Sequence, residues 1–188
     1  ERIVGCVATH GHEDHVGALQ YLLRDASFPL YGSAMTLGLA RNRIAEARLT
    51  EKTKFIEVDD NDRVKIGPFE VEFFRAAHSI VDGCGLAIRT PAGLIVHTGD
   101  FKLDPTPVDN QPTDLGRLAS YGEEGVLLLF SDSTNVENTG QTLSERTVGD
   151  ALNDLLPRCT GKILVATFSS NIHRIQQIVN AAIKAERK

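Results

Sequence analysis

The feature that most constrains this chain is a cluster of histidines at the junction between a predicted strand and a predicted helix. Half of its six histidines, His10, His12 and His15, fall within six residues. The apolar run Ile3–Thr9 is rich in β-branched residues and predicts a buried strand directly before the cluster. Asp14 is a typical first residue of a helix, and apolar residues follow it at helical spacing. A buried strand that leads through such a cluster into a helix indicates an α/β fold.

The residue types in this cluster are those that bind divalent metal ions. His10 and His12 are two residues apart, so an extended turn points both side chains to one side, and Gly11 allows the backbone to bend between them. Asp14 and His15 can reach a second point close by. Imidazole nitrogen and carboxylate oxygen suit zinc or a similar ion, and two adjacent groups favour two ions bridged by an oxygen. The alternative, a polar loop with histidines by chance, accounts poorly for so dense a cluster.

Hydrophobic patterning predicts alternating strands and helices along the chain. Strands are expected at residues 3–9, 29–32, 55–58, 63–66, 69–75, 85–90, 94–98, 126–130 and 162–167. Helices are expected from Asp14 onward and over residues 33–48, 114–121, 144–157 and 171–188. Five consecutive apolar residues make Val126–Phe130 a predicted central strand. Near Thr142 a strand-rich part gives way to a helix–strand–helix pattern, so we divide the chain into residues 1–141 and 142–188.

Cysteine count, apolar runs and charge exclude several classes of protein. Three separated cysteines without a CxxC pair argue against a disulfide scaffold and a thiolate zinc site, and they fit a reducing cytoplasm. The longest apolar run, Val126–Phe130, is far shorter than the roughly 18 residues of a membrane span. The net charge of −5 disfavours nucleic acid as a partner, but residues 141–188 hold seven Lys and Arg against four Asp and Glu. The basic last quarter therefore keeps a nucleic-acid partner open.

Five short motifs, taken in order, give the chain a specific resemblance. They are Thr9–His15 (THGHEDH), His78 in AAHS, Asp100 in HTGD, Ser131–Asn135 (SDSTN) and Thr167–Arg174 (TFSSNIHR). Together they resemble the ribonuclease J family, bacterial and archaeal nucleases of the β-CASP group within the metallo-β-lactamase superfamily. The similarity covers nearly the whole chain, and the motifs are specific in combination.

The resemblance implies an α/β fold with two parts. Residues 1–141 would form a partial metallo-β-lactamase αββα sandwich, and residues 142–188 would begin a β-CASP α/β domain. The first strands of the sandwich normally precede the HxHxDH motif and are missing from this sequence, and the chain starts at Glu1 rather than Met, so we expect a piece of a longer protein. In the family, a general-acid histidine and a last metal-ligand histidine lie further along. These 188 residues alone are therefore expected to be inactive or weakly active.

Carried over position by position, the resemblance also implies a two-metal site. The implied ligands are His10, His12 and His78 for one ion, Asp14 and His15 for the second, and Asp100 as a bridge between them. Asp132, in the first β-CASP motif, would orient a ligand histidine. The implied catalytic residues are Asp14, Asp100 and Asp132. Two zinc ions are the expected cofactors, and manganese stays open because histidine-rich sites accept both metals.

The last motif leaves two interpretations open for its polar residues. Ser169 and Ser170 lie between a predicted strand and a predicted helix, where backbone N–H groups suit an RNA phosphate but serines also cap helices. Arg174 adds positive charge, and His173 either contacts an RNA phosphate or lies on a solvent-exposed face. Outside this motif, His97 is expected to be a core residue of a strand rather than a metal ligand.

The function implied by the resemblance is metal-dependent hydrolysis of RNA phosphodiesters, by endonuclease and 5′→3′ exonuclease activity, in RNA processing and decay. The substrate would be single-stranded RNA with a 5′-monophosphate, in the cytoplasm and without a membrane partner, and the parent protein would be a homodimer or homotetramer. A hydrolase of the same fold acting on a small thioester or lactam would share the metal ligands, but it would not need Ser131–Asn135 or the basic segment from Thr142. A DNA nuclease of the β-CASP group stays open, as does a chain that binds without catalysis.

Overall fold

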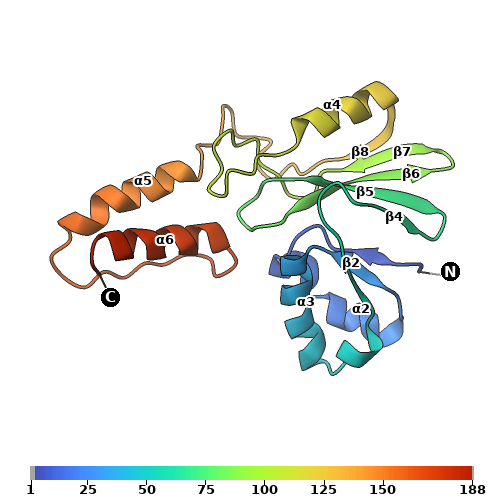
Figure 1. Cartoon of the computed structure of the whole chain (residues 1–188), viewed down its shortest axis with the longest axis horizontal. Coiled ribbons are helices and arrows are strands. Elements are labelled where there is room, and N and C mark those ends of the chain that lie inside the picture. Colours follow the sequence, from blue (N-terminus) through green and yellow to red (C-terminus); the bar gives the residue numbers. More distant parts are fainter. Residues whose placement is uncertain (1–2, 188) are drawn as a thin grey trace.

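The computed structural model describes residues 3–187 and arranges two β-sheets and their helices in layers (Figure 1). The first sheet is parallel, in the order β1-β2-β3, with bounds Cys6–Val7, Leu30–Gly32 and Phe55–Glu57. The second has the order β4-β5-β6-β7-β8, with bounds Arg63–Ile66, Phe69–Arg75, Cys84–Thr90, Gly93–His97 and Val126–Phe130. The helices are α1 (Glu13–Val16), α2 (Leu19–Asp25), α3 (Ala34–Glu46), α4 (Leu115–Glu124), α5 (Arg146–Leu155) and α6 (Ile172–Lys184), with short 3₁₀ turns at Thr50–Lys52 and Leu156–Arg158.

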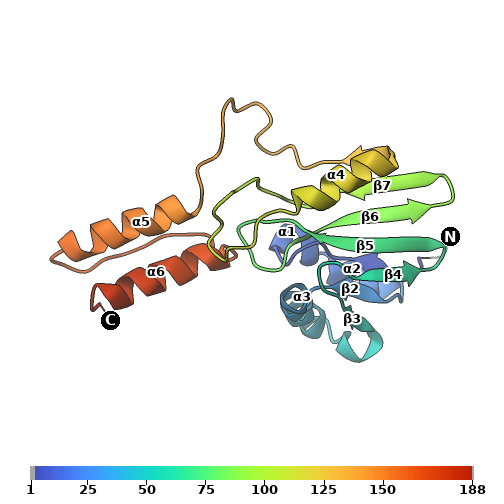
Figure 2. The ribbon, with the colours of Figure 1, turned by 45° about the horizontal axis from the view of Figure 1, so that its top comes forward.

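The helices α2 and α3 form a layer on the first sheet (Figure 2). α3 begins where the Ser33 hydroxyl accepts a hydrogen bond from the N–H of Thr36 (3.3 Å), as a serine at a helix start does. Leu37 and Ile44 on α3 are buried in one cluster with Leu30 of β2. Removal of these aliphatic side chains from water holds the helix layer on the sheet.

Strand β5 contributes to two interfaces, because its side chains point alternately to the two faces of the second sheet. Val71 and Phe73 face one side, where they join Tyr31 of the first sheet in a buried cluster. Phe74 faces the other side and packs against Tyr121 of α4, with ring centroids 5.7 Å apart. Apolar clusters thus fill a helix–sheet, a sheet–sheet and a sheet–helix interface in succession. This order of layers confirms the predicted partial αββα sandwich.

The second sheet brings two loops to one of its edges. β6 is antiparallel to both β5 and β7, so β5 and β7 run in the same direction and end on the same side. The loops that follow them begin at Ala76 and Thr98. The end of β1 arrives at the same place, because the N–H of Cys84 donates a hydrogen bond to the carbonyl of Thr9 (2.9 Å). Three loops from two sheets therefore meet at one end of the sandwich.

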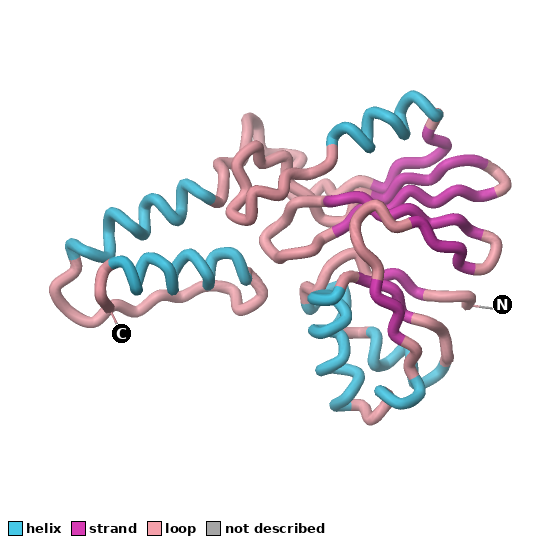
Figure 3. The backbone as a smooth tube through the Cα atoms, viewed as in Figure 1, coloured by secondary structure: helices cyan, strands magenta, loops and turns pink. Residues whose placement is uncertain are grey.

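Two apolar segments differ from their prediction. Val126–Phe130 forms β8, but β8 is the edge strand of its sheet rather than a central one, and all five residues are exposed. Residues 162–167, predicted as a strand, form loop (Figure 3). Both runs are apolar enough for a buried strand. A strand, however, also needs backbone partners on a neighbouring strand, and within residues 3–187 the segment 162–167 has none.

The helices α5 and α6 lie side by side and project away from the sandwich (Figures 1 and 2). α6 begins at Asn171, whose side chain accepts the N–H of Arg174 (3.0 Å), and ends at Lys184. The predicted helix extended to Lys188, which is outside the described residues. The predicted division at residue 142 falls in the loop between β8 and α5 and stays a prediction. Within residues 3–187, no helix has both the length and the apolar character that crossing a membrane requires.

Candidate metal centre

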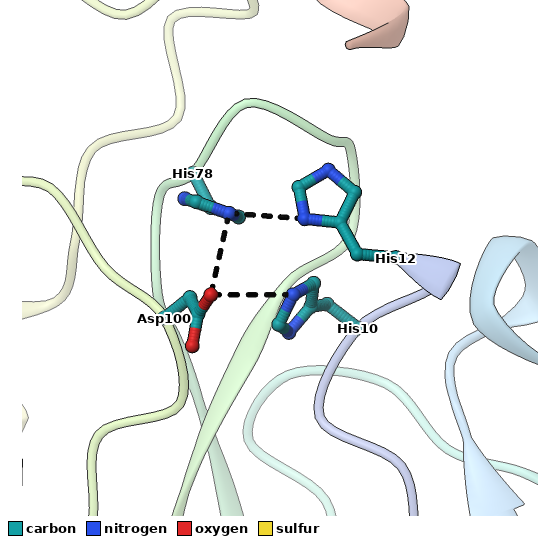
Figure 4. A group of neighbouring side chains, drawn as sticks. All are labelled: His10, His12, His78 and Asp100. Atoms are coloured by element: carbon teal, nitrogen blue, oxygen red, sulfur yellow. Dashed lines mark hydrogen bonds and ion pairs between the residues drawn. The ribbon is translucent and has the colours of Figure 1, made fainter. Parts of the chain in front are cut away.

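Four side chains converge where the three loops meet (Figure 4). His10 and His12 follow β1, His78 follows β5 and Asp100 follows β7. Each offers one ligand atom, and these four atoms all lie within 4.8 Å of one another. Residues up to 90 positions apart in the chain are thus brought into one group, within the span that a single metal ion can occupy.

The ring nitrogens and the carboxylate oxygen of this group lie close to one another. His78 Nε2 lies 3.1 Å from His12 Nδ1, and Asp100 Oδ2 lies 3.7 Å from the Nε2 atoms of both His10 and His78. The rings of His10 and His12 meet edge to face, with centroids 4.8 Å apart. Three imidazoles and one carboxylate therefore point their polar atoms at one small volume.

His10 tests whether these residues fit a divalent cation. It is 1% exposed, its Nδ1 lies 3.1 Å from the Thr9 hydroxyl, and its buried Nε2 has no hydrogen-bond partner in the described structure. Burial, followed by the charges of His15, His78 and His12, lowers the pKa of His10 to about 3. The ring is therefore neutral, and its Nε2 faces Asp100 Oδ2 at 3.7 Å. An orphaned nitrogen among imidazole and carboxylate donors suits zinc or a similar ion.

Of the other two predicted ligands, His15 approaches the same carboxylate and Asp14 approaches His15. The ring centroid of His15 is 4.0 Å from that of His10. Its Nε2 lies 3.5 Å from Asp100 Oδ2 and 3.5 Å from Asp14 Oδ2, although the Asp14 side chain is largely exposed. Asp100 Oδ2 is thus within 3.7 Å of Nε2 in three histidines, His10, His15 and His78. The geometry places Asp100 between two groups of donors.

Two glycines allow the ligand loops to come this close. Gly99 has a φ of +62°, and a side chain there would place its Cβ 2.6 Å from the Cys84 carbonyl oxygen. Gly11 lies outside the left-handed region, and its Cβ would fall 2.5 Å from Leu39 Cδ1 on α3. Glycine at position 11 therefore serves close packing against a helix, and its part in the bend between His10 and His12 stays a prediction.

Asp132, predicted to orient a ligand histidine, follows β8 at the rim of the site. Its Oδ1 accepts hydrogen bonds from the N–H (2.9 Å) and the hydroxyl (2.6 Å) of Thr134. Burial raises its pKa, but the hydrogen bonds from Thr134 and the Phe101 backbone outweigh burial and lower it overall. Among the described contacts Asp132 has no direct hydrogen bond to a histidine, and its charge acts on His10 and His78 through space. Its orienting role stays a proposal.

A cavity of about 860 Å³ opens from the metal centre toward the helical arm formed by α5 and α6. His78, Asp100 and Asp132 line one part of it, and Glu145 and His173 line another. His173, for which the sequence left open an RNA contact or a solvent-exposed face, is 8% exposed, so the second interpretation is wrong, and it lines the same cavity as His78 and Asp100. This volume is large enough for a small ligand or for a short segment of a longer one.

The four residues predicted to contact phosphate differ in their burial and in their hydrogen-bond partners. Arg174 makes two hydrogen bonds to the Glu145 carboxylate (2.7 and 2.8 Å), and His173 is buried with its Nε2 3.7 Å from Asp109 Oδ2. Ser169 is exposed and Ser170 half-buried, and neither caps α6, because Asn171 does so. Burial lowers the pKa of His12, and a contact with the Ser170 backbone opposes that shift, so this loop lies close to the metal centre.

Sequence reasoning missed two hydroxyls that contact the ligands. Thr9 Oγ1 lies 3.1 Å from His10 Nδ1, and Ser79 Oγ lies 3.3 Å from His12 Nε2. Each residue directly precedes or follows a predicted ligand, which is the one signal in the sequence that could have found them. His97, predicted to be buried, is instead exposed, because its strand lies beside the uncovered β8; its Nδ1 accepts the N–H of Gly99 (3.0 Å).

Comparison with known proteins adds two family matches. The family model described as "Beta-lactamase superfamily domain" matches residues 1–116. The model described as "Ribonuclease J, beta-CASP domain" matches residues 160–188. A crystal structure of a protein of unknown function from Enterococcus faecalis V583 superposes with a TM-score of 0.65 at 19% identity, over 94% of this chain and 44% of that one. That likeness supports the fold.

Curated relatives are closer in sequence. Ribonuclease J of Helicobacter pylori is 47% identical over 100% of this chain and 27% of its own length. Ribonuclease J of Thermus thermophilus is 45% identical over 100% of this chain and 34% of its own length. The chain thus spans about a quarter to a third of the relatives it matches. The order of its layers, its converging histidines and the family match show that the chain belongs to the beta-lactamase superfamily. Within that superfamily, the relatives named above are ribonucleases J.

Proposed function

We propose that this chain carries the metal centre of an RNA phosphodiester hydrolase with endonuclease and 5′→3′ exonuclease activity in RNA processing and decay. The observation that carries the proposal is the convergence of His10, His12 and His78 on Asp100, with a buried and unpartnered nitrogen on His10. The ribonuclease J relatives supply the substrate class.

The proposed ligands divide into two groups that share Asp100. His10, His12 and His78 hold one divalent ion, Asp14 and His15 hold a second, and Asp100 faces both. Zinc is the proposed metal and manganese is the alternative, since imidazole and carboxylate donors accept either. When bound, such ions supply Lewis-acid chemistry that offsets the negative charge developing on a phosphodiester under attack.

The residues of this chain prepare the site before any ion arrives. Burial keeps His10 neutral, and the contact between its Nδ1 and the Thr9 hydroxyl holds the ring with Nε2 facing Asp100. Asp132 holds a negative charge at the rim, where it acts on His10 and His78. We propose that this charge, or a small rearrangement that brings the carboxylate to an imidazole N–H, orients a ligand histidine.

The cavity gives the substrate its path. We propose that single-stranded RNA with a 5′-monophosphate enters between the metal centre and the helical arm, where Ser169, Ser170, His173 and Arg174 contact phosphates. Glu145 pairs with Arg174, so a phosphate that binds Arg174 either shares its guanidinium group with the Glu145 carboxylate or displaces that carboxylate. We further propose that the protein acts in the cytoplasm, as a homodimer or homotetramer.

Replacement of Asp100 by alanine in the whole gene product tests the metal centre. We expect RNA cleavage to fall at least about a hundredfold, because both groups of donors lose their shared carboxylate. Asp25→Ala, which removes an exposed carboxylate at the end of α2, is the matched control and should leave cleavage unchanged. Cleavage is followed with 5′-monophosphorylated single-stranded RNA, and the same sequence as DNA is assayed beside it.

Unchanged RNA cleavage by Asp100→Ala would contradict the assignment of the metal centre. Hydrolysis of a lactam or thioester without RNA cleavage would favour the small-molecule alternative, and cleavage of DNA alone would favour the DNA nuclease. The 188 residues by themselves are expected to cleave RNA weakly or not at all, since they span about a quarter to a third of the relatives.

A further inference from the structure

The two loops that carry His78 and Asp100 leave strands that are not neighbours. They follow β5 and β7, and β6 lies between these strands. Adjacent strands are about 4.8 Å apart, so the two loops start about 10 Å from each other. Hydrogen bonds within the sheet end at the strand ends, so other contacts must hold the loops at the separation that the ligands need.

One threonine hydroxyl completes a closed set of hydrogen bonds between these loops. The N–H of Lys102 donates to the Ala77 carbonyl (2.7 Å), and the N–H of Ala77 donates to Thr113 Oγ1 (2.9 Å). Thr113 Oγ1–H in turn donates to the Lys102 carbonyl (2.9 Å). Ala77 directly precedes His78, and Lys102 follows Asp100 by two residues. The hydroxyl therefore links the two ligand loops from a position outside both.

Thr113 is itself held in place by the start of a helix. The N–H of Asp114 donates to the Arg75 carbonyl at the end of β5 (3.0 Å). The Asp114 side chain accepts the N–H of Arg117 in the first turn of α4 (2.9 Å). Thr113 is only 7% exposed, so water does not compete readily for its hydroxyl. The bridge is thus attached to the sheet and to α4 rather than to a free loop.

We propose that Thr113 is a positioning residue, whose hydroxyl fixes the separation of His78 and Asp100 and so prepares the centre for a metal ion. This inference rests on the proposed metal centre. Accepting one hydrogen bond while donating another requires a hydroxyl, so serine can replace Thr113 in this role, whereas valine, of nearly the same shape, cannot. A purely space-filling role would show the opposite preference.

The whole gene product with Thr113→Val, Thr113→Ser or Thr53→Val provides the test. Thr53 is a matched control, because it is 8% exposed and its hydroxyl donates to the Leu49 carbonyl (2.8 Å) away from the metal centre. Affinity for Zn²⁺ is measured by competition with a chelator, and ligand geometry by the visible absorption of the Co²⁺-loaded protein. We expect Thr113→Val to bind Zn²⁺ about 10- to 100-fold more weakly, with an altered Co²⁺ spectrum. Thr113→Ser and Thr53→Val should keep both properties of the unchanged protein.

Three results would overturn the assignment of Thr113. Equal affinity and spectrum in Thr113→Val and the unchanged protein would show that the bridge does not matter. A loss in Thr113→Ser as large as in Thr113→Val would show that a hydroxyl at this position is not enough to hold the two loops. If the unchanged protein binds no metal, the metal centre itself is wrong and the role of Thr113 falls with it.

Hydrogen exchange decides the case if Thr113→Val does not fold. A bridge that prepares the site exists before the ion arrives, so the Ala77 amide should exchange slowly in metal-free protein as well as in loaded protein. Slow exchange in both states supports the proposal. Fast exchange of this amide in metal-free protein would show that the ion organises the loops, and would overturn it.

Discussion

Single residues that never touch a metal decide where the ligands stand. Gly99 is the clearest case, because it adopts a left-handed backbone conformation directly before Asp100. Its α-carbon also passes so close to the Cys84 carbonyl that a methyl group would collide with backbone. Neither the dihedral angle nor the space at this position suits another residue, so the placement of Asp100 depends on it.

Gly99→Ala should therefore affect both stability and metal binding. We expect the free energy of unfolding to fall by about 1–3 kcal/mol from backbone strain, and metal affinity to fall because Asp100 moves. Gly161→Ala is the control, since a Cβ there has nothing within 4 Å and its φ is outside the left-handed region. Urea unfolding and chelator competition measure the two effects. A Gly99→Ala variant with unchanged metal affinity would show that Asp100 is not held by this turn.

The ligands could be predicted from sequence more readily than the residues that support them. His10, His12, Asp14 and His15 stand close together in the chain, so their spacing alone indicates a shared site. Thr113 has no such signal, because its two partners lie 36 and 11 positions away and are backbone groups. Contacts of this kind arise only when the sheet has formed.

At the scale of elements, a buried charge network fastens α4 to the second sheet. The Glu72 side chain on β5 is 2% exposed and accepts hydrogen bonds from Arg63 of β4 (2.7 Å) and Arg89 of β6 (2.8 Å). Arg117 of α4 bonds its other oxygen, and Tyr121 of α4 packs nearby. Burial raises the pKa of Glu72, but the hydrogen bond from Arg89 and the charges of Arg63 and Arg89 lower it overall.

This network should make stability depend on pH in the acid range. Because the folded pKa of Glu72 is below its ordinary value of 4.5, its contribution is full above that pH and is lost as the pH falls. The facing groups, Arg63, Arg89 and Arg117, stay charged throughout. Glu72→Gln should cost about 3–5 kcal/mol at pH 7, because three arginines lose their counter-charge, and less at pH 4.

Urea unfolding at pH 7 and pH 4 measures this dependence. Glu70→Gln is the control on the same strand, where an exposed carboxylate pairs with Arg63 (3.2 Å), and it should cost less than about 1 kcal/mol. An equal cost of Glu72→Gln at both pH values would show that Glu72 is not ionised in the network.

Helices and strands were predicted correctly where the sequence features that specify them are local. The bounds of β4 and β5 match their predictions, because their alternating residues and flanking turns are local features. The segment 162–167 does not, because pairing requires a neighbour that the segment itself does not specify. In α6 the apolar residues Ile175, Val179 and Ile183 are exposed, while His173, Gln177 and Ala181 face inward. Periodicity identified this helix but not the face that packs.

At the scale of the whole molecule, β8 leaves a long apolar strand at the edge of a sheet. All five of its side chains are exposed, and one backbone edge is unpaired within residues 3–187. An exposed, flat and apolar edge strand is a site where another chain can pair. The described molecule therefore presents a surface that favours self-association.

We expect the 188-residue chain to associate through β8. Leu127 and Leu129 are 61% and 57% exposed, and replacing both with lysine should keep the chain monomeric at concentrations where the unchanged chain associates. Leu103→Lys is the control, because Leu103 is 60% exposed but lies outside the strand. Light scattering over a concentration series measures the association. A monomeric unchanged chain, or equal relief by Leu103→Lys, would contradict the role of β8.

The way in which the helical arm joins the sandwich has a consequence of its own. Asp104 accepts the N–H of Glu145, Lys102 donates to the Leu143 carbonyl (2.5 Å), and none of the three apolar clusters of the described residues includes a residue of α5 or α6. Water can replace hydrogen bonds at little net cost, but it cannot replace apolar packing. Polar contacts, rather than a shared apolar cluster, therefore hold this joint. His78 and Asp100 lie on one side of this joint and His173 lies on the other, so a change of angle there alters the width of the cavity between them while the distances among His10, His78 and Asp100 stay the same.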